Sequence, residues 1–144
     1  MRKLRRQRAD FAQISRFLAS AQKKLAAARK TLDIDAETSY QLAYEAMLKA
    51  SLGYMLSFEV RPRSLPGHHV TIIQFAEEHL GPAFKNLIAL FDRMRRKRHQ
   101  AIYQVTGFIS SLEAEQALAI AGEYLAAIRE AIQKKNPQMR LHLK

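Results

Sequence analysis

The sequence contains no cysteine and no tryptophan in its 144 residues. Without cysteine, neither a disulfide scaffold nor a thiolate metal site can form. The longest apolar runs are only a few residues, too short for a membrane-spanning helix or for the apolar segment of a secretory signal. We therefore expect a cytoplasmic protein of one domain, with no membrane association.

Acidic residues are scarce relative to basic ones. The chain has 24 Lys and Arg against 13 Asp and Glu, a net charge of +11. A domain this basic attracts polyanions through its summed field, which leaves RNA, DNA and anionic lipid as partner classes. Lipid is disfavoured, because no helix combines a strongly basic face with bulky apolar residues beyond those that a core needs.

Several catalytic signatures are also missing. There is no glycine-rich phosphate loop, no serine nucleophile elbow and no pair of carboxylates placed for acid–base chemistry. His68 and His69 follow Gly67, but no further His, Asp or Glu stands near them at ligand spacing. The sequence therefore predicts no metal site and no cofactor.

Apolar residues recur at spacings of three and four along most of the chain, which is typical of helices, and no stretch alternates with a period of two. The first helix is predicted over 10–31 from the series Phe11, Ile14, Leu18, Ala21, Leu25, Ala28 and Leu32. A second, capped by Asp33 or Asp35, ends before "RPRSLPGHH", where two prolines and a glycine forbid continuation.

Three further helices are predicted. They cover about 69–80, 82–104, and a last segment that begins at a Ser110–Glu113 capping box and runs to Asn136. Since four of the five helices are long and the connections are short, the sequence predicts an all-α, antiparallel up-and-down four-helix bundle with an additional short helix.

The predicted bundle occupies residues 10–135. Before it, residues 1–9 contain "MRKLRRQR", in which five of eight residues are basic. This segment is interpreted as a basic N-terminal arm, either frayed or forming a first helical turn, with a solubilising tail as the simplest role. Residues 136–144 form a C-terminal tail of no assigned structure.

The stretch "FDRMRRKRHQAIYQ" at 91–104 carries the most informative charge pattern. On a helical wheel of about 100° per residue, Arg98 falls inside the apolar sector and Arg95 on its shoulder. His99 and Tyr103 lie further round the same side, whereas Arg93 and Lys97 point outward.

An arginine on a core stripe loses several kcal/mol in desolvation unless it finds a partner. Either Arg98 reaches carboxylates or carbonyls between helices, or this side faces a cleft or subunit interface that binds anions.

These residues, with "DAETSYQLAYEAMLKASLGYML" and "HHVTIIQFAEEHL", resemble the HEPN superfamily of small bacterial and archaeal helical-bundle proteins over about residues 10–133. The family motif is an arginine, often followed by asparagine, with a histidine four to six residues beyond. The resemblance implies that this motif lies at the cleft of a homodimer and, in active members, cleaves RNA without a metal.

Two registers of the motif fit the chain. One takes Arg93 with His99, but the wheel separates them by about 120°. The other aligns Arg98, His99 and Tyr103 with the family's arginine, asparagine and histidine, and it is favoured because Arg98 points inward. In this hypothesis His99 deprotonates a ribose 2′-OH and Arg95 or Arg98 stabilises the charge on phosphorus, which gives a 2′,3′-cyclic phosphate. Tyr103 is a poor base but can donate a hydrogen bond to phosphate.

The candidate catalytic residues are therefore Arg93, Arg98, His99 and Tyr103, with Arg95, Arg96 and Lys97 as candidate phosphate-binding residues. Three functions follow as hypotheses: an endoribonuclease of a toxin–antitoxin or defence system, a non-catalytic RNA- or nucleotide-binding protein, and a structural interaction bundle. The chain lacks the nucleotidyltransferase signature that often accompanies the HEPN fold. Any antitoxin or nucleotidyltransferase partner would thus be a separate protein.

Overall fold

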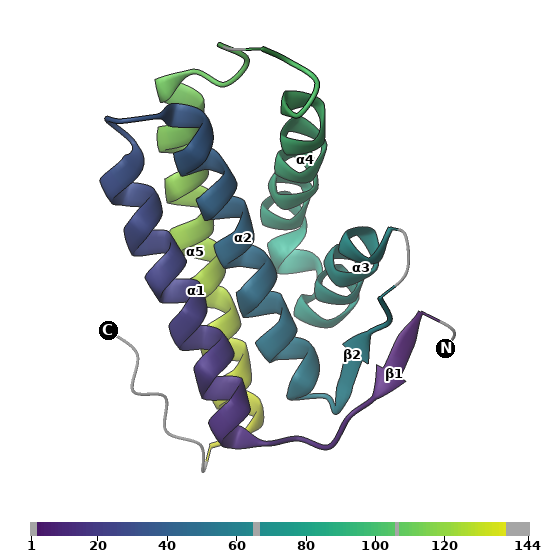
Figure 1. Ribbon diagram of the computed structural model, residues 1–144. Coiled ribbons are helices and arrows are strands. Elements are labelled where there is room, and N and C mark those ends of the chain that lie inside the picture. The colour runs from purple at the N-terminus through teal and green to yellow at the C-terminus, as the bar shows by residue number, and fades with distance from the viewer. Residues whose placement is uncertain (1–2, 65–66, 106, 138–144) are drawn as a thin grey trace.

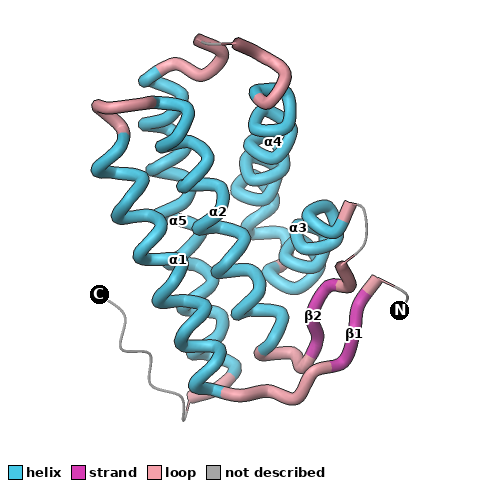
Figure 2. The backbone as a smooth tube through the Cα atoms, viewed as in Figure 1, coloured by secondary structure: helices cyan, strands magenta, loops and turns pink. Residues whose placement is uncertain are grey.

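A computed structural model describes residues 3–64, 67–105 and 107–137. Within them the chain is predominantly helical, as the all-α prediction required, with one small sheet (Figures 1 and 2). The elements are β1 (Leu4–Arg6), α1 (Phe11–Thr31), α2 (Ala36–Leu56), β2 (Val60–Pro62), α3 (His68–Leu80), the 3₁₀ turn η1 (Pro82–Phe84), α4 (Lys85–Ala101) and α5 (Ser111–Lys135).

Side-chain caps fix the starts of the three longest helices. The Asp10 carboxylate accepts the first free N–H groups of α1, and Asp35, rather than Asp33, accepts from Thr38 at the start of α2. The predicted capping box of α5 is confirmed, because the Ser110 hydroxyl accepts from the Glu113 N–H and the Glu113 carboxylate accepts from the Ser110 N–H.

Helix α2 is the centre of the molecule. It contacts α1, α5, α3 and α4, and in Figure 1 α1, α2 and α5 run side by side while α3 lies beside the C-terminal half of α2. Its buried residues are mostly small or aromatic, among them Ala43, Ala46, Ala50, Gly53 and Tyr44. Small residues let neighbouring helices approach closely, so α2 sets the spacing of the helices around it.

Helices α1 and α2 approach one another closely at Gly53. A Cβ atom at this position would lie 3.2 Å from the Phe17 Cβ and 3.5 Å from the Ile14 carbonyl oxygen. Neither neighbouring atom can move without a shift of α1 itself. By contrast, a Cβ at Gly122 of α5 would meet only the Arg29 Nη2 atom, at 3.9 Å, and that atom ends a flexible side chain.

The first prediction compares these two glycines. We expect Gly53→Ala to lower the free energy of unfolding by about 1–2 kcal/mol, because overpacking outweighs the gain in helix propensity. As the matched control, Gly122→Ala should raise the free energy of unfolding by about 0.5–1 kcal/mol, since the added methyl group makes only an ordinary van der Waals contact with the end of the Arg29 side chain. Urea denaturation measures both values; an increase for Gly53→Ala would contradict the close helix contact.

The N-terminal segment differs from its prediction. Residues 4–6 form neither a frayed arm nor a helical turn but strand β1, which pairs antiparallel with β2 in the register Leu4 to Pro62, Arg5 to Arg61 and Arg6 to Val60. Leu4 and Val60 pack against the core. Both strands have three residues, which is too short for a period of two to show in the sequence.

Glu59 accepts two hydrogen bonds from the segment that leads from β1 to α1. Its carbonyl oxygen accepts a hydrogen bond from the Gln7 N–H at 2.9 Å, and its carboxylate accepts one from the Ala9 N–H at 3.2 Å. Glu59 also has a φ of 61°, in the left-handed region that residues other than glycine rarely adopt. A residue in this conformation needs surrounding contacts to hold it, and the N-terminal segment supplies two.

The helix predicted over 82–104 begins as the 3₁₀ turn η1 and ends at Ala101, three residues earlier than expected. The chain then tightens, since the N–H groups of Tyr103 and Gln104 bond to the carbonyls three residues before them. As a result Ile102, Tyr103 and Val105 are 60%, 76% and 97% exposed. A helix continued to residue 104 and beyond would have placed Ile102 and Val105 in the apolar sector of the wheel.

None of the helices in the described ranges has both the length and the apolar character needed to cross a membrane.

Candidate functional site

A pocket of about 470 Å³ opens between α1, α2, α3 and the segment around β2. The residues that α1 and α2 contribute include the apolar Phe17, Leu48 and Leu52 and the polar Gln13, Glu45 and Lys49. The rest of the lining is rich in nitrogen donors: Arg61, Arg63, His68, His69 and Arg98. Arg98 is the one lining residue that α4 contributes, so its side chain reaches the pocket from the edge.

Arg98 points inward, as the helical wheel predicts. Its guanidinium carbon lies 5.5 Å from the centre of the Tyr44 ring, a cation–π contact. The Arg98 Nε atom is buried and has no hydrogen-bond partner in the structure. Since a buried donor without a partner costs about 1–3 kcal/mol, this atom indicates either an unfavourable site or one that a ligand completes.

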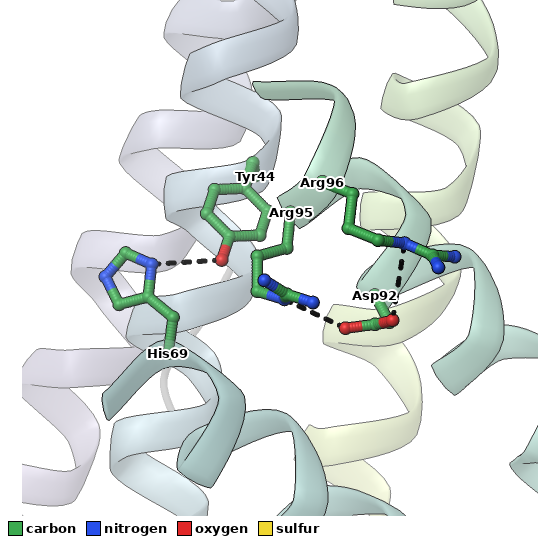
Figure 3. A network of polar contacts seen from close by, with 5 residues as sticks. All are labelled: Tyr44, His69, Asp92, Arg95 and Arg96. Atoms are coloured by element: carbon green, nitrogen blue, oxygen red, sulfur yellow. Dashed lines mark hydrogen bonds and ion pairs between the residues drawn. The ribbon is translucent and has the colours of Figure 1, made fainter. Parts of the chain in front are cut away.

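Tyr44 and His69 form a hydrogen-bonded pair beside Arg98. The Tyr44 hydroxyl lies 3.1 Å from His69 Nδ1, and the second ring nitrogen of His69 faces away from Tyr44 (Figure 3). Burial raises the pKa of Tyr44 well above its ordinary value, so the phenol keeps its proton. We therefore assign Tyr44 as the donor to Nδ1, which puts the proton of the neutral imidazole on Nε2.

The charge state of His69 follows from its surroundings. Burial first, and then the nearby His68, Arg98 and Arg95, lower the pKa of His69 below its ordinary value of 6.5. At neutral pH the ring is thus uncharged and offers an Nε2–H donor. A bound anion would act in the opposite direction and raise this pKa.

Cations outnumber carboxylates in the pocket. Among the lining residues, Lys49, Arg61, Arg63 and Arg98 carry positive charge and Glu45 is the one acid. The Glu45 carboxylate also binds Lys24, at 3.3 Å between Oε1 and Nζ. The pocket therefore presents an uncompensated positive field above an apolar wall, which suits a ligand with one anionic end and one flat apolar end.

Two of the predicted phosphate-binding residues are engaged elsewhere. The Asp92 carboxylate binds Arg95, at 2.9 Å from Nε, and Arg96, at 3.6 Å from Nε. Figure 3 shows Arg95 turned toward Asp92. These i,i+3 and i,i+4 pairs on α4 are typical of a helix surface.

Lys97 and Arg93 lie on another side of α4. Lys97 binds the Glu113 carboxylate at 2.9 Å and covers the Phe108 ring, with Nζ 4.2 Å from the ring centre. This contact links α4 to the start of α5. Arg93 is exposed and lines a small cavity of about 100 Å³ that also includes Tyr40 and Glu113.

His99 and Tyr103 stand apart from the pocket within one chain. Both are exposed, their ring centres are 5.7 Å apart, and neither is among the residues that line the cavity at Arg98. Because α4 ends at Ala101, Tyr103 no longer lies on the helix that carries Arg98. The structure thus brings Arg98 together with His69 and Tyr44 rather than with His99 and Tyr103.

Sequence reasoning missed most of the pocket. His69 and Tyr44 are 25 residues apart, and Arg61 and Arg63 sit in a segment that looks like an ordinary turn. Only the inward position of Arg98 signalled a polar site. No cluster of three or more His, Asp or Glu side chains that could hold a metal occurs in the part of the chain that the structure describes.

The chain was compared with protein-family models, with curated proteins and with solved structures, and none of the three comparisons gave a match. The likeness to the HEPN superfamily therefore rests on the residues of this sequence.

The second prediction concerns the titration of His69. We expect NMR to show the Nε2–H tautomer at neutral pH and a titration midpoint below 6.5. Arg98→Met should raise that midpoint, because one neighbouring cation is removed. Since the unfolded chain binds this proton more readily, His69 should also lower the stability of the folded state as the pH falls below about 6.5.

The control for this titration is Arg96→Met, which removes a charge from the same helix at an exposed position. It should leave the midpoint almost unchanged. A His69 midpoint that does not respond to Arg98→Met would show that the two side chains do not share the pocket.

Proposed function

We propose that this chain is a HEPN-like protein that binds a phosphate group of RNA or of a nucleotide in the pocket at Arg98. The observation that carries the proposal is the buried Arg98 Nε, which has no hydrogen-bond partner among the described residues. A phosphate oxygen is the acceptor that a guanidinium group binds best, since two parallel charge-assisted hydrogen bonds can form.

The rest of the pocket supports a nucleotide rather than an isolated phosphate ion. Arg61 and Arg63 supply further charge at the mouth, and neutral His69 adds a hydrogen-bond donor. Phe17 and Leu52 offer an apolar wall on which a base or sugar can rest. A volume of about 470 Å³ is within the range of small-ligand sites.

The geometry favours binding over cleavage. His99, the base of the endoribonuclease hypothesis, is exposed and does not line the pocket of its own chain. Metal-independent cleavage to a 2′,3′-cyclic phosphate would need a second chain to bring His99 to a bound phosphate. Cleavage is thus the second candidate function, and it depends on the homodimer described next.

The proposal includes the four-helix up-and-down arrangement of the HEPN fold and a homodimer formed near the end of α4. Four large apolar side chains are exposed around the α4–α5 connection: Ile102, Tyr103, Val105 and Leu112. A second copy of the chain that covered them would also bring His99 and Tyr103 of both copies toward one cleft. A separate antitoxin or nucleotidyltransferase partner is part of the same HEPN-like proposal.

The third prediction tests phosphate binding. Arg98→Met should weaken the binding of AMP or of a single-stranded RNA 12-mer by about tenfold or more, because it removes a charge-assisted contact. Calorimetry measures the affinity, and Arg96→Met is the matched control, expected to bind within about twofold of the unchanged protein. Full affinity in Arg98→Met, or no binding by the unchanged protein, would refute the proposal.

The same variant separates a binding role for Arg98 from a structural one. If Arg98 served only to hold helices together, its loss would lower the melting temperature. We expect an unchanged or higher melting temperature, because methionine fills the space without leaving a buried donor unpaired.

The fourth prediction tests the dimer. Sedimentation should give about twice the chain mass of 16.5 kDa, and Ile102→Asp combined with Val105→Asp should give the single mass. A charge buried in an apolar interface costs several kcal/mol, enough to separate the copies. Ile34→Asp is the control, since Ile34 is 82% exposed on the α1–α2 turn. A single mass for the unchanged protein would exclude the dimer.

A further inference from the structure

The ribbon formed by β1 and β2 has two unlike faces. Side chains of a strand alternate between faces, so Leu4 shares one face with its neighbours Val60 and Pro62. Leu4 and Val60 pack against the core. The opposite face, here called the basic face, carries Lys3, Arg5, Arg61 and Arg63.

Like charges stand directly opposite one another on the basic face. Arg5 pairs with Arg61 in the sheet register, and the Arg63 N–H donates to the Lys3 carbonyl at 2.9 Å, which places Lys3 opposite Arg63. All four side chains are exposed. Like charges opposite one another destabilise a strand pair, so this arrangement weakens the ribbon unless an anion lies across it.

No carboxylate in the described part of the chain forms an ion pair with any of the four residues. The ion pairs of that part join Lys24 to Glu45, Arg95 and Arg96 to Asp92, and Lys97 to Glu113. The acid nearest in sequence, Glu59, accepts a hydrogen bond from the Ala9 N–H. The chain therefore does not neutralise the basic face itself.

The basic face continues into the pocket. Arg61 and Arg63 of this face also line the pocket, together with Arg98. Residues two apart on a strand are separated by about 6.6 Å, similar to the distance between successive phosphates of a nucleic-acid strand. A strand with one phosphate at Arg98 could thus place its next phosphates along Arg63 and Arg61, with Lys3 and Arg5 opposite them on the neighbouring strand.

We infer that the basic face of the β1–β2 ribbon binds the backbone of a single-stranded RNA, so that the ligand of the pocket is a polynucleotide rather than a free nucleotide. This inference rests on the proposed function. The inference gives the basic N-terminal residues a role, because Lys3 and Arg5 double the number of cations that Arg61 and Arg63 alone would present to the RNA. An anionic membrane is disfavoured as the partner, since the apolar side chains of the ribbon are packed against the core and cannot enter lipid.

The test uses Lys3→Gln combined with Arg5→Gln, two residues of the basic face that do not line the pocket. Binding of a fluorescein-labelled, single-stranded RNA 12-mer is measured by anisotropy over a range of salt concentrations, and binding of AMP by calorimetry. Each lost phosphate contact reduces the slope of log affinity against log salt by about 0.7, so a reduction of about 1.4 is expected, while the affinity for AMP stays within about twofold.

The matched control is Lys23→Gln combined with Lys30→Gln, which removes the same charge from exposed positions on α1. A second variant, Arg5→Glu, places opposite charges across the ribbon. It should weaken RNA binding further and leave the melting temperature equal or higher, because the cross-strand repulsion becomes attraction. A lower melting temperature together with weaker binding would mean that the ribbon acts only in folding, and would overturn the inference.

Three further outcomes separate failure of this inference from failure of the proposed function. If Lys3→Gln with Arg5→Gln changes RNA binding no more than the control does while AMP still binds, the inference fails and the proposed function stands. If these substitutions abolish adsorption to phosphatidylserine vesicles and leave RNA binding intact, the ribbon is a membrane contact and the inference also fails. If neither AMP nor RNA binds the unchanged protein, the proposed function fails as well.

Discussion

Close contact between α1 and α2 is the constraint on which the rest of the structure depends. The two helices approach so closely at Gly53 that an added methyl carbon would lie 3.2 Å from the Phe17 Cβ, and α5, α3 and α4 then pack around α2. This arrangement places Tyr44 of α2 at the junction with α3 and α4, where it supports Arg98 through its ring and His69 through its hydroxyl. Phe17, which contacts Gly53 in α1–α2 packing, also lines the pocket, so the pocket depends directly on this helix contact.

The positive charge of the pocket depends on which basic residues form ion pairs with carboxylates and which do not. On α4, Asp92 satisfies Arg95 and Arg96, and Glu113 satisfies Lys97, so most of the basic run is balanced locally. Among the described residues no carboxylate forms an ion pair with Arg98, and Arg61 and Arg63 join it from a segment far away in sequence. A run that looks uniformly basic in sequence thus contains three residues held in ion pairs, the exposed Arg93, and Arg98 with a buried open donor.

Much of the helical structure was predictable, because caps and apolar spacing are local signals. The Ser110–Glu113 capping box and the glycine and proline at Gly81–Pro82 mark helix boundaries that the structure has. The unusual position of Arg98 was predictable for the same reason, since a helical wheel gives the direction of a side chain. A helical wheel does not show which other element the Arg98 side chain meets. For that reason His69 was missed as its neighbour, and His99 was grouped with Arg98 instead.

The ribbon was beyond sequence reasoning for a different reason. Its pairing joins Leu4 to Pro62 across a whole helical hairpin, and three-residue strands carry no periodic signal. The end of α4 was missed because the apolar spacing continues through Ile102 and Val105, although the helix does not. For the ribbon, a tertiary contact rather than local preference decides the structure.

The link between Glu59 and the N-terminal segment has a consequence for the order of folding. Helices α1 and α2 are neighbours in the chain and can meet early, whereas β1 must wait until the residues after α2 are in place. The cations of β1 and β2 repel one another during that closure, which slows it further. Surface charge able to hold a polyanion would therefore come together only after α1 and α2 have met, so a chain in which this hairpin has not formed would lack it.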